Sequence, residues 1–237
     1  MSFQFRNFHV NDAHTAMKVG TDAVLLGTWA PVCPAGATIV DAGAGCGVVS
    51  LLMAERNPDA HVIGVEVDAA AAADCRENFA ASPWARRMTV VESALEDWKP
   101  DCKVDFIISN PPFFTETLRS PDGRRASARH CGTMSPLTVM DFAARWLKAD
   151  GRLAMITACG NRRDVLFHGE LQGLHLHALT HVCPREGSPE KRLLWLWGRA
   201  PVSEYVETCL YIRDAGGNWC DDYVALVSDF YLRMPNP

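Results

Sequence analysis

The chain has 237 residues, of which 48% are hydrophobic and 22% are charged, and it carries a net charge of −5. This size and composition predict a soluble globular protein with one large core, and no apolar run is long enough to span a membrane. The acidic balance excludes a protein that coats nucleic acid with its whole surface, so any RNA-binding surface must be a local basic one.

The N-terminus and the cysteines indicate the compartment. Residues 1–9 contain no apolar signal core, so we expect no export. The nine cysteines are scattered, and the closest two, Cys209 and Cys220, are eleven positions apart. Cysteines without metal-binding spacing, in a chain without a secretion signal, predict a cytoplasmic protein without a zinc site.

The first 36 residues precede the first predicted core strand. Phenylalanines alternate loosely with polar residues near the start, as in an edge strand or a segment that covers the core; they are Phe3, Phe5 and Phe8. An apolar helix is predicted over 23–29, with Asp22 as its N-terminal cap. We therefore expect residues 1–36 to be a cover segment of the domain that residues 37–237 form.

From residue 37 onward, predicted strands and helices alternate. Strands are predicted over 37–41, 61–66, 88–92, 104–109, 152–157, 175–182 and 192–198, and helices over 47–56, 69–80, 135–148 and 161–170. This alternation predicts an α/β fold with a seven-stranded, mostly parallel sheet and helices on both faces.

The end of the chain departs from this alternation. Residues 184–190 contain no helix, which predicts that the last two strands form an antiparallel hairpin at the end of the sheet. A further strand is expected near 206–213. The chain then ends in a predicted helix with one apolar face, made by Tyr223, Leu226, Val227 and Phe230.

A glycine-rich turn follows the first core strand. The strand ends at Asp41, and Gly43, Gly45 and Gly47 alternate behind it. Glycines permit a tight turn and let a ligand lie against bare backbone. The spacing differs from the Gly-x-Gly-x-x-Gly of dinucleotide sites, so we predict no pyrophosphate cradle. Nineteen residues past the last glycine, the second strand ends at Glu66, whose carboxylate can accept both hydrogen bonds of a ribose diol.

The strand predicted over 104–109 leads into Asn110, Pro111, Pro112 and Phe113. Ligands of α/β sheets bind beyond the carboxyl ends of the strands, so this turn is expected at the same rim as the glycine-rich turn. The two prolines fix the backbone, which holds the Asn110 side chain and the Pro111 carbonyl in place. Phe113 offers a flat apolar face.

These groups suit methyl transfer to the amine of adenine, whose lone pair is delocalised into the ring. The Asn110 side-chain oxygen and the Pro111 carbonyl can accept the two hydrogens of the amine. Both hydrogen bonds strengthen as the nitrogen becomes tetrahedral, so they stabilise the transition state more than the ground state. Phe113 would stack on a base rotated away from its neighbours. The reaction needs no metal and no covalent intermediate.

The two motifs together resemble those of the class I amino-methyltransferases that act on adenine, on guanine and on glutamine of release factors. Residues 17–31, which begin Met-Lys-Val-Gly-Thr-Asp, and residues 77–87 look like segments of the bacterial valine-tRNA adenine N6-methyltransferases. The resemblance runs from about Phe3 to Leu232. It implies a Rossmann-like class I fold, S-adenosylmethionine (SAM) as the cofactor, tRNA as the partner, and methylation of adenosine 37, next to the anticodon of valine tRNA.

The resemblance also implies roles for single residues. Lys18, Gly20 and Thr21 would fold over the methionine end of SAM. The remaining cofactor-binding residues would follow the first three core strands; they are Asp41, Gly43, Gly45, Gly47, Glu66, Val67, Ser93 and Ala94. The family usually has Asp where Ala94 stands, so the contact to the adenine amino group is lost or passes to Ser93 or to backbone. It usually has Tyr where Phe113 stands, so stacking survives without a hydroxyl.

An arginine-rich stretch follows the Asn-Pro-Pro-Phe turn, with only Asp122 to offset it. Its arginines fall within eleven residues; they are Arg119, Arg124, Arg125 and Arg129. We expect this loop to bind tRNA phosphates beside the target base. Arg162 and Arg163, after the fifth strand, could extend the basic patch. Three histidines at 175, 177 and 181 could share a strand face, but a solvated face is a simpler interpretation than a metal site.

Other functions stay open. Glutamine N5-methyltransferases of proteins use the same tetrapeptide but carry a sizeable helical domain before the glycine-rich turn, whereas only 40 residues precede Asp41 here. Guanine N2 methylation of ribosomal RNA suits Phe113 equally well. A noncatalytic SAM- or RNA-binding factor would account for Ala94 but not for the intact turn at Asn110. We expect a monomer that acts without a metal or a membrane.

Overall fold

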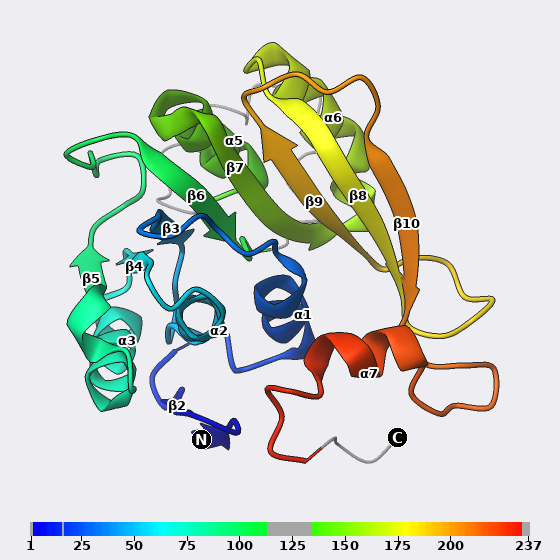
Figure 1. Ribbon diagram of the computed structural model, residues 1–237, viewed down its shortest axis with the longest axis horizontal. Helices are drawn as coiled ribbons and strands as arrows, with labels where there is room; N and C mark the ends of the chain where they lie inside the picture. The colour runs from blue at the N-terminus through cyan, green and yellow to red at the C-terminus, as the bar shows by residue number, and fades with distance from the viewer. Residues whose placement is uncertain (1, 16, 113–133, 234–237) are drawn as a thin grey trace, which may run out of the picture.

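The computed structural model describes residues 2–15, 17–112 and 134–233. Its main sheet contains β3 (Thr38–Ala42), β4 (His61–Glu66), β5 (Met88–Glu92), β6 (Val104–Ser109), β7 (Leu147–Ala158), β8 (His175–Cys183), β9 (Arg192–Gly198) and β10 (Val206–Tyr211). The strand order is β10-β8-β9-β7-β6-β3-β4-β5, and β9 is antiparallel to both of its neighbours. All other neighbours are parallel, so the predicted α/β class and the mostly parallel sheet are confirmed (Figure 1).

The sheet has eight strands in the described part of the chain, rather than the predicted seven. The strand expected near 206–213 is β10, and it pairs in parallel with β8 from Val206↔Ala178 to Tyr211↔Cys183. The antiparallel β8–β9 hairpin therefore lies inside the sheet, and its predicted place at the end was wrong. The first four residues of β10 are exposed, so its sequence carries little apolar signal, but its backbone covers the polar edge that β8 would otherwise present.

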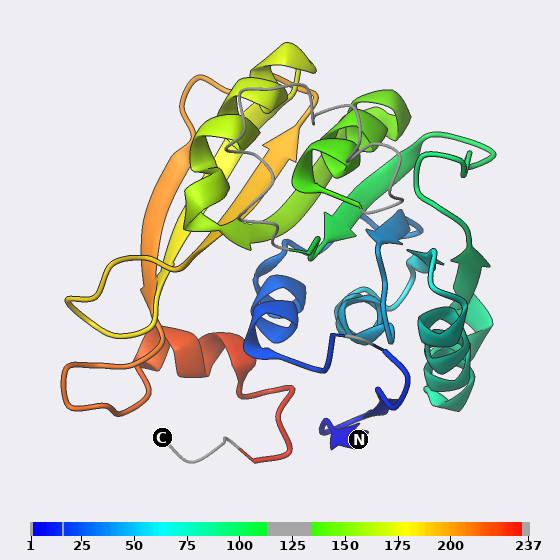
Figure 2. The same cartoon turned by 180° about the vertical axis from the view of Figure 1, so that it is seen from behind.

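Helices cover both faces of the sheet. They are α1 (Thr21–Trp29), α2 (Val48–Arg56), α3 (Ala69–Ala81), α5 (Pro136–Trp146), α6 (Arg162–Leu171) and α7 (Asp221–Val227), with short 3-10 turns at Ala85–Arg87 and Cys159–Asn161. One core lies between the sheet and α1, α2, α3 and α7, and a second lies beneath α5 and α6. Figures 1 and 2 show these two groups on opposite sides of the sheet. The helix predicted over 135–148 ends two residues early because Leu147 already pairs with Val104 as part of β7.

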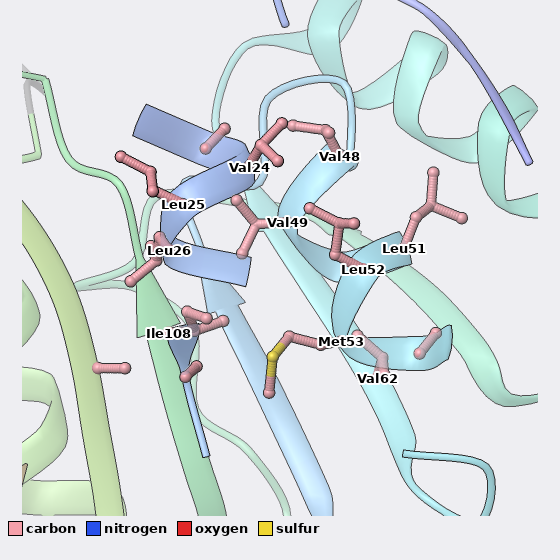
Figure 3. Packing of buried hydrophobic residues seen from close by; sticks show 14 of the residues in the cluster. Val24, Leu25, Leu26, Val48, Val49, Leu51, Leu52, Met53, Val62 and Ile108 are labelled. Carbon is pink, nitrogen blue, oxygen red and sulfur yellow. The ribbon is translucent and has the colours of Figure 1, made fainter. Parts of the chain in front are cut away.

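The helix α1 is buried on almost all sides, which explains its continuous apolar sequence. Its residues from Ala23 to Thr28 are all buried, and side chains such as Val24 lie in one layer with Val49 and Leu52 of α2 (Figure 3). A Cβ on Gly27 would lie 2.7 Å from a Leu52 methyl carbon, so glycine is needed where the two helices meet.

The predicted cap of α1 was wrong. The capping position is Gly20, which makes no side-chain cap, and the carboxylate of Asp22 instead accepts a hydrogen bond from Arg192 Nε at 2.8 Å. Arg192 begins β9, so this ion pair fastens the start of α1 to the main sheet.

The first residues form a separate two-stranded antiparallel sheet of β1 (Ser2–Gln4) and β2 (His9–Asn11). They are therefore a cover rather than an edge of the main sheet. Phe5 is fully buried and stacks on Phe8 and on Tyr231, with ring centres 4.4 and 6.1 Å apart. The two ends of the chain thus pack together. None of the helices in the described ranges has the length and apolar character needed to cross a membrane.

Candidate active site

Parallel pairing brings the two predicted turns together. Asp41 of β3 pairs with Ile108 of β6, so Gly43 and Asn110 each lie two residues beyond a common register point. The buried Ser109 hydroxyl donates to the Ala42 carbonyl at 2.7 Å and ties the two strand ends to each other. The glycine-rich turn and the Asn110 turn therefore share one rim of the sheet, as the sequence predicts.

The glycine-rich turn adopts a backbone that favours glycine. Gly43, Gly45 and Gly47 have φ angles of 75°, 55° and 84°. The amides of Gly43 and Ala44 both donate to the Val65 carbonyl, at 2.9 and 3.0 Å. A Cβ on Gly47 would lie 2.6 Å from the Phe79 ring, so this position is closed by packing as well as by conformation.

The Glu66 carboxylate is fixed beneath this turn by two backbone amides. Gly45 N–H donates to Oε2 at 2.8 Å, and Asp68 N–H donates to Oε1 at 2.9 Å. Each carboxylate oxygen can accept a second hydrogen bond, so a diol can still bind. The Ser93 amide donates to the Glu66 carbonyl at 3.0 Å, and the Ser93 hydroxyl donates to the Ala94 carbonyl at 3.0 Å. Val67, 54% exposed, completes the predicted set at this end of the rim.

Asp41 lies beneath the turn rather than at its surface. Its carboxylate is 1% exposed and accepts a hydrogen bond from the Ser50 hydroxyl at 2.7 Å. Burial raises the pKa of Asp41 to about 7, against the opposing effect of the Ser50 hydrogen bonds and with a further rise from the Glu66 charge. Asp41 thus connects the end of β3 with the first turn of α2.

Residues 11–15 and 17–20, here called the cover loop, are held over the glycine-rich turn by two side chains of α3. Asp74 Oδ2 accepts hydrogen bonds from His14 N–H, Thr15 N–H and the Thr15 hydroxyl, at 2.8, 3.2 and 3.2 Å. Burial raises the pKa of Asp74, but the hydrogen bonds from His14 and Thr15 outweigh burial and hold it below its usual value. One turn further along α3, Asn78 bonds both backbone groups of Asn11 and the Cys46 carbonyl, each at 2.8 Å.

The rest of the cover loop borders a cavity. Lys18 Nζ donates to the carbonyls of Asp12 and Ala13, which folds its side chain back onto the loop. The cavity has a volume of about 270 Å³ and is lined by Met17, Lys18, Gly20, Thr21, Asp22, Ala23 and Asn110. The structure therefore brings the predicted residues Lys18, Gly20 and Thr21 to the Asn110 turn.

Asn110 holds an unused hydrogen-bond acceptor at this cavity. Its Oδ1 atom is buried and has no hydrogen-bond partner among the described residues, while its Nδ2 group points at Met17 Sδ over 3.9 Å. A buried acceptor without a donor destabilises a fold by roughly 1–3 kcal/mol, so the free oxygen indicates a group kept for a donor that enters the site. Pro111 is buried and Pro112 partly buried behind it.

Several predicted residues lie outside the described ranges. They are Phe113, Arg119, Arg124, Arg125 and Arg129. Arg162, which could extend the basic patch, lies within the described ranges. Its guanidinium forms an ion pair with Glu207 at 3.1 Å. His181 bonds the same carboxylate at 2.8 Å, and His177 contacts Arg152. Within residues 2–15, 17–112 and 134–233, no three His, Cys, Asp or Glu side chains gather as metal ligands would.

Four residues of this region were missed by the sequence analysis: Met17, Asp74, Asn78 and Ser109. Asp74 and Asn78 are polar residues four apart on an alanine-rich helix, a spacing that places both on one face and could have indicated a bound segment. Ser109 interrupts an apolar strand directly before Asn110, which could have indicated a hydroxyl bonded to the neighbouring strand. Nothing in the sequence distinguishes Met17 from an ordinary apolar residue.

Comparisons with known proteins agree with this arrangement. The Methyltransferase small domain family matches residues 13–160. The chain is 38% identical to the tRNA1(Val) (adenine(37)-N6)-methyltransferase of Aeromonas hydrophila, and the match covers 98% of each chain. It is 34% identical to the protein of the same description from Parabacteroides distasonis, again over 98% of each chain.

Solved structures share the fold at low sequence identity. A predicted O-methyltransferase from Agrobacterium tumefaciens has a TM-score of 0.68 at 20% identity, over 92% of this chain and 100% of that one. A geranyl diphosphate methyltransferase in complex with GPP and sinefungin has a TM-score of 0.56 at 18% identity, over 74% of this chain and 76% of that one. These similarities establish the architecture alone.

Proposed function

The chain belongs to the family of tRNA1(Val) (adenine(37)-N6)-methyltransferases, and on that premise we propose that it transfers a methyl group from SAM to the N6 amine of adenosine 37 in valine tRNA. One observation supports this reaction above the others. Asn110 keeps a buried, unpartnered oxygen at the rim where the glycine-rich turn lies. An exocyclic amine is a donor that fits this acceptor.

The residues at the rim fit SAM as the cofactor. The three positive φ angles let the backbone of Gly43, Gly45 and Gly47 approach a ligand, and Glu66 retains acceptor capacity for a ribose diol. Ser93 and Ala94 would face the adenine of the cofactor, and Lys18, Gly20 and Thr21 its methionine end. SAM supplies the electrophilic methyl group when it is bound.

The protein's contribution to the chemistry is to hold the amine. Asn110 Oδ1 and the Pro111 carbonyl would accept the two N–H groups of the adenine, which aims the nitrogen lone pair out of the plane of the ring. The backbone at both acceptors is held before the substrate arrives, that of Asn110 by the end of β6 and that of Pro111 by its ring and by burial. Because the hydrogen bonds strengthen as the nitrogen loses planarity, they lower the barrier rather than only tightening binding.

The proposed partner is tRNA. The arginines at 119, 124, 125 and 129 would bind tRNA phosphates, and Phe113 would stack on the flipped base. We propose a cytoplasmic monomer that needs no metal, organised as a cover segment over residues 1–36 and one methyltransferase domain over 37–237. Free thiols at all eight described cysteines support a reducing compartment.

The test is methyl transfer from tritiated SAM to unmodified valine tRNA, followed by nucleoside analysis. N6-methyladenosine at position 37 is expected, and a tRNA with guanosine at that position should accept no label. Labelled N2-methylguanosine from ribosomal RNA, with no label in tRNA, would contradict the proposal and favour the guanine reaction. Binding of SAM and tRNA without transfer would favour the noncatalytic interpretation.

A further inference from the structure

The thioether of Met17 lies against the side-chain amide of Asn110. The Asn110 Nδ2 group donates toward Met17 Sδ over 3.9 Å, and both residues line the cavity of about 270 Å³. Met17 comes from the cover loop, whereas Asn110 follows β6, so the contact joins residues that are 93 positions apart. Among the described residues, Met17 is the hydrogen-bond partner of the Asn110 side-chain amide, because the Oδ1 atom has no partner.

The sulfur determines which way the amide faces. An asparagine amide can sit in two orientations that exchange its oxygen and its NH₂ group while occupying the same space. A thioether sulfur accepts hydrogen bonds but has no hydrogen to donate. The orientation with NH₂ toward Met17 is therefore favourable, and the inverted one would place two electron-rich atoms against each other.

The orientation matters for the proposed reaction. With NH₂ toward Met17, the oxygen faces away from the sulfur as a free acceptor. In the inverted orientation, the amide would present N–H groups to the N–H groups of the target amine, and no hydrogen bond could form between them. Because Oδ1 has no other partner to fix it, the amide would otherwise divide its time between the two orientations.

We propose that Met17 is a positioning residue that selects the orientation of the Asn110 amide in which its oxygen is available to the target amine. This inference rests on the proposed function, since it assigns Met17 a role in holding the same acceptor. Met17 is 47% exposed, so its replacement removes little buried surface and should not disturb the core.

The first experiment compares Met17→Leu with Met17→Gln and with a matched control, Met88→Leu. Leucine keeps the size of methionine but has no acceptor, whereas glutamine offers an acceptor oxygen. Met88 Sδ also accepts a hydrogen bond, from the Ser82 hydroxyl at 3.7 Å, but it lies on β5 at the far edge of the sheet. Met17→Leu should lower kcat roughly threefold to tenfold, as expected for loss of one weak hydrogen bond, with KM for SAM and tRNA unchanged. Met17→Gln should recover most of the rate, and Met88→Leu should behave as wild type.

A wild-type kcat in Met17→Leu would overturn the proposal. Equal losses of kcat in the leucine and glutamine variants would also overturn it, because side-chain shape rather than an acceptor would then matter. A KM for SAM that rises as much as kcat falls would indicate a general loosening of the cover loop and would likewise contradict it.

The second experiment needs no substrate and separates this inference from the proposed function. The side-chain ¹⁵N–¹H signals of Asn110 are assigned by their disappearance in Asn110→Ala. Met17→Leu should shift them clearly more than Met88→Leu does. If these signals do not change, the proposed contact is refuted even in an active enzyme. If they shift but wild-type protein methylates no tRNA, the contact stands and the proposed function fails.

Discussion

The glycine-rich turn and the Asn110 turn lie side by side at one rim, yet they differ in whether their polar groups have hydrogen-bond partners. Around the glycines, the Glu66 oxygens, the Asp41 carboxylate and the Asn78 amide all have hydrogen-bond partners within the protein. At the other turn, Asn110 has a weak contact to sulfur and an oxygen without a partner. The polar groups of one half of the site are paired within the protein, and the other half holds an acceptor without a partner among the described residues.

This difference fits the proposal that one rim binds both a cofactor and a substrate. A cofactor that is the same in every turnover is best met by a rigid, satisfied surface, because no free energy is then lost in ordering it. An acceptor that acts in the transition state must instead be left free at the start. We therefore expect substitutions on the two sides to separate binding from rate.

The largest effect should come from removing the free acceptor. Asn110→Ala should lower kcat by roughly 10²–10³, as loss of one preorganised transition-state partner does. Steady-state kinetics would measure it, with KM for SAM and tRNA nearly unchanged. Because Oδ1 has no partner among the described residues, the free energy of unfolding should not fall. A kcat near that of wild type would mean that the amine is not held at Asn110.

The next effect concerns stability on the glycine side. The folded-state pKa of Asp41 is raised by burial to about 7, so the folded protein holds a proton that the unfolded chain releases near pH 4. The contribution of Asp41 to the free energy of unfolding is fully present below pH 4. It is lost as the pH rises toward 7, which lowers the free energy of unfolding by roughly 2–4 kcal/mol.

Asp41→Asn should remove this part of the pH dependence. Urea unfolding between pH 4 and pH 8 would measure it, with the exposed Asp101→Asn as the control. The free energy of unfolding should fall with rising pH less steeply in Asp41→Asn than in wild type or the control. Parallel curves for all three proteins would contradict the assignment of a raised pKa to Asp41.

A smaller effect should fall on cofactor binding alone. Both Glu66 oxygens accept backbone N–H groups, so Glu66→Gln must turn an NH₂ group toward one of these donors. We expect the affinity for SAM to weaken by about 1–3 kcal/mol, measured by calorimetry. Asn110→Ala, measured alongside, should keep the wild-type Kd. The comparison between the two turns fails if Asn110→Ala weakens SAM binding more than Glu66→Gln does.

The smallest effect should come from the bond that joins the two sides. Ser109→Ala removes the hydroxyl that donates to the Ala42 carbonyl at 2.7 Å. The free energy of unfolding should fall by about 1–2 kcal/mol, the value typical of one buried hydrogen bond, and kcat should fall because Asn110 is the next residue. Denaturant unfolding and kinetics on the same preparation would test both effects. A loss of stability with unchanged kcat would show that Asn110 is placed without help from Ser109.

The sequence predicts the parts of this molecule that follow from periodicity and local chemistry. Short aliphatic stretches within five to six residues place β3, β4 and β6, and the alternating glycines mark the turn that follows Asp41. These signals are local, since a buried parallel strand is mostly aliphatic and a backbone with positive φ selects glycine. The same reasoning places Glu66 and Asn110 at one rim.

The features that sequence reasoning missed depend on contacts between distant segments. The strand expected near 206–213 is β10, but its place at the edge beside β8, which puts the β8–β9 hairpin inside the sheet, was missed. Aspartate is a residue type that often caps helices, but the carboxylate of Asp22 accepts a hydrogen bond from Arg192, which is 170 residues away. From the sequence, Asp74 would be a solvent-facing helix residue. Its role appears only in the folded structure, where it accepts hydrogen bonds from the cover loop. Such roles are fixed by tertiary structure and leave little local signal.

The two anchors on α3 also limit how the site can open. Asp74 and Asn78 bind Asn11, His14 and Thr15 at one end of the cover loop. At its other end, the buried helix α1 begins at Thr21. The stretch between Thr15 and Thr21 is anchored at both ends and can span at most about 20 Å, so it can move only a short distance. Any widening of the cavity on this side would then need either a small displacement of this stretch or release of the α3 anchors. In hydrogen exchange, the amides of Asn11, His14 and Thr15 would report that release directly, through a local opening that is separate from global unfolding.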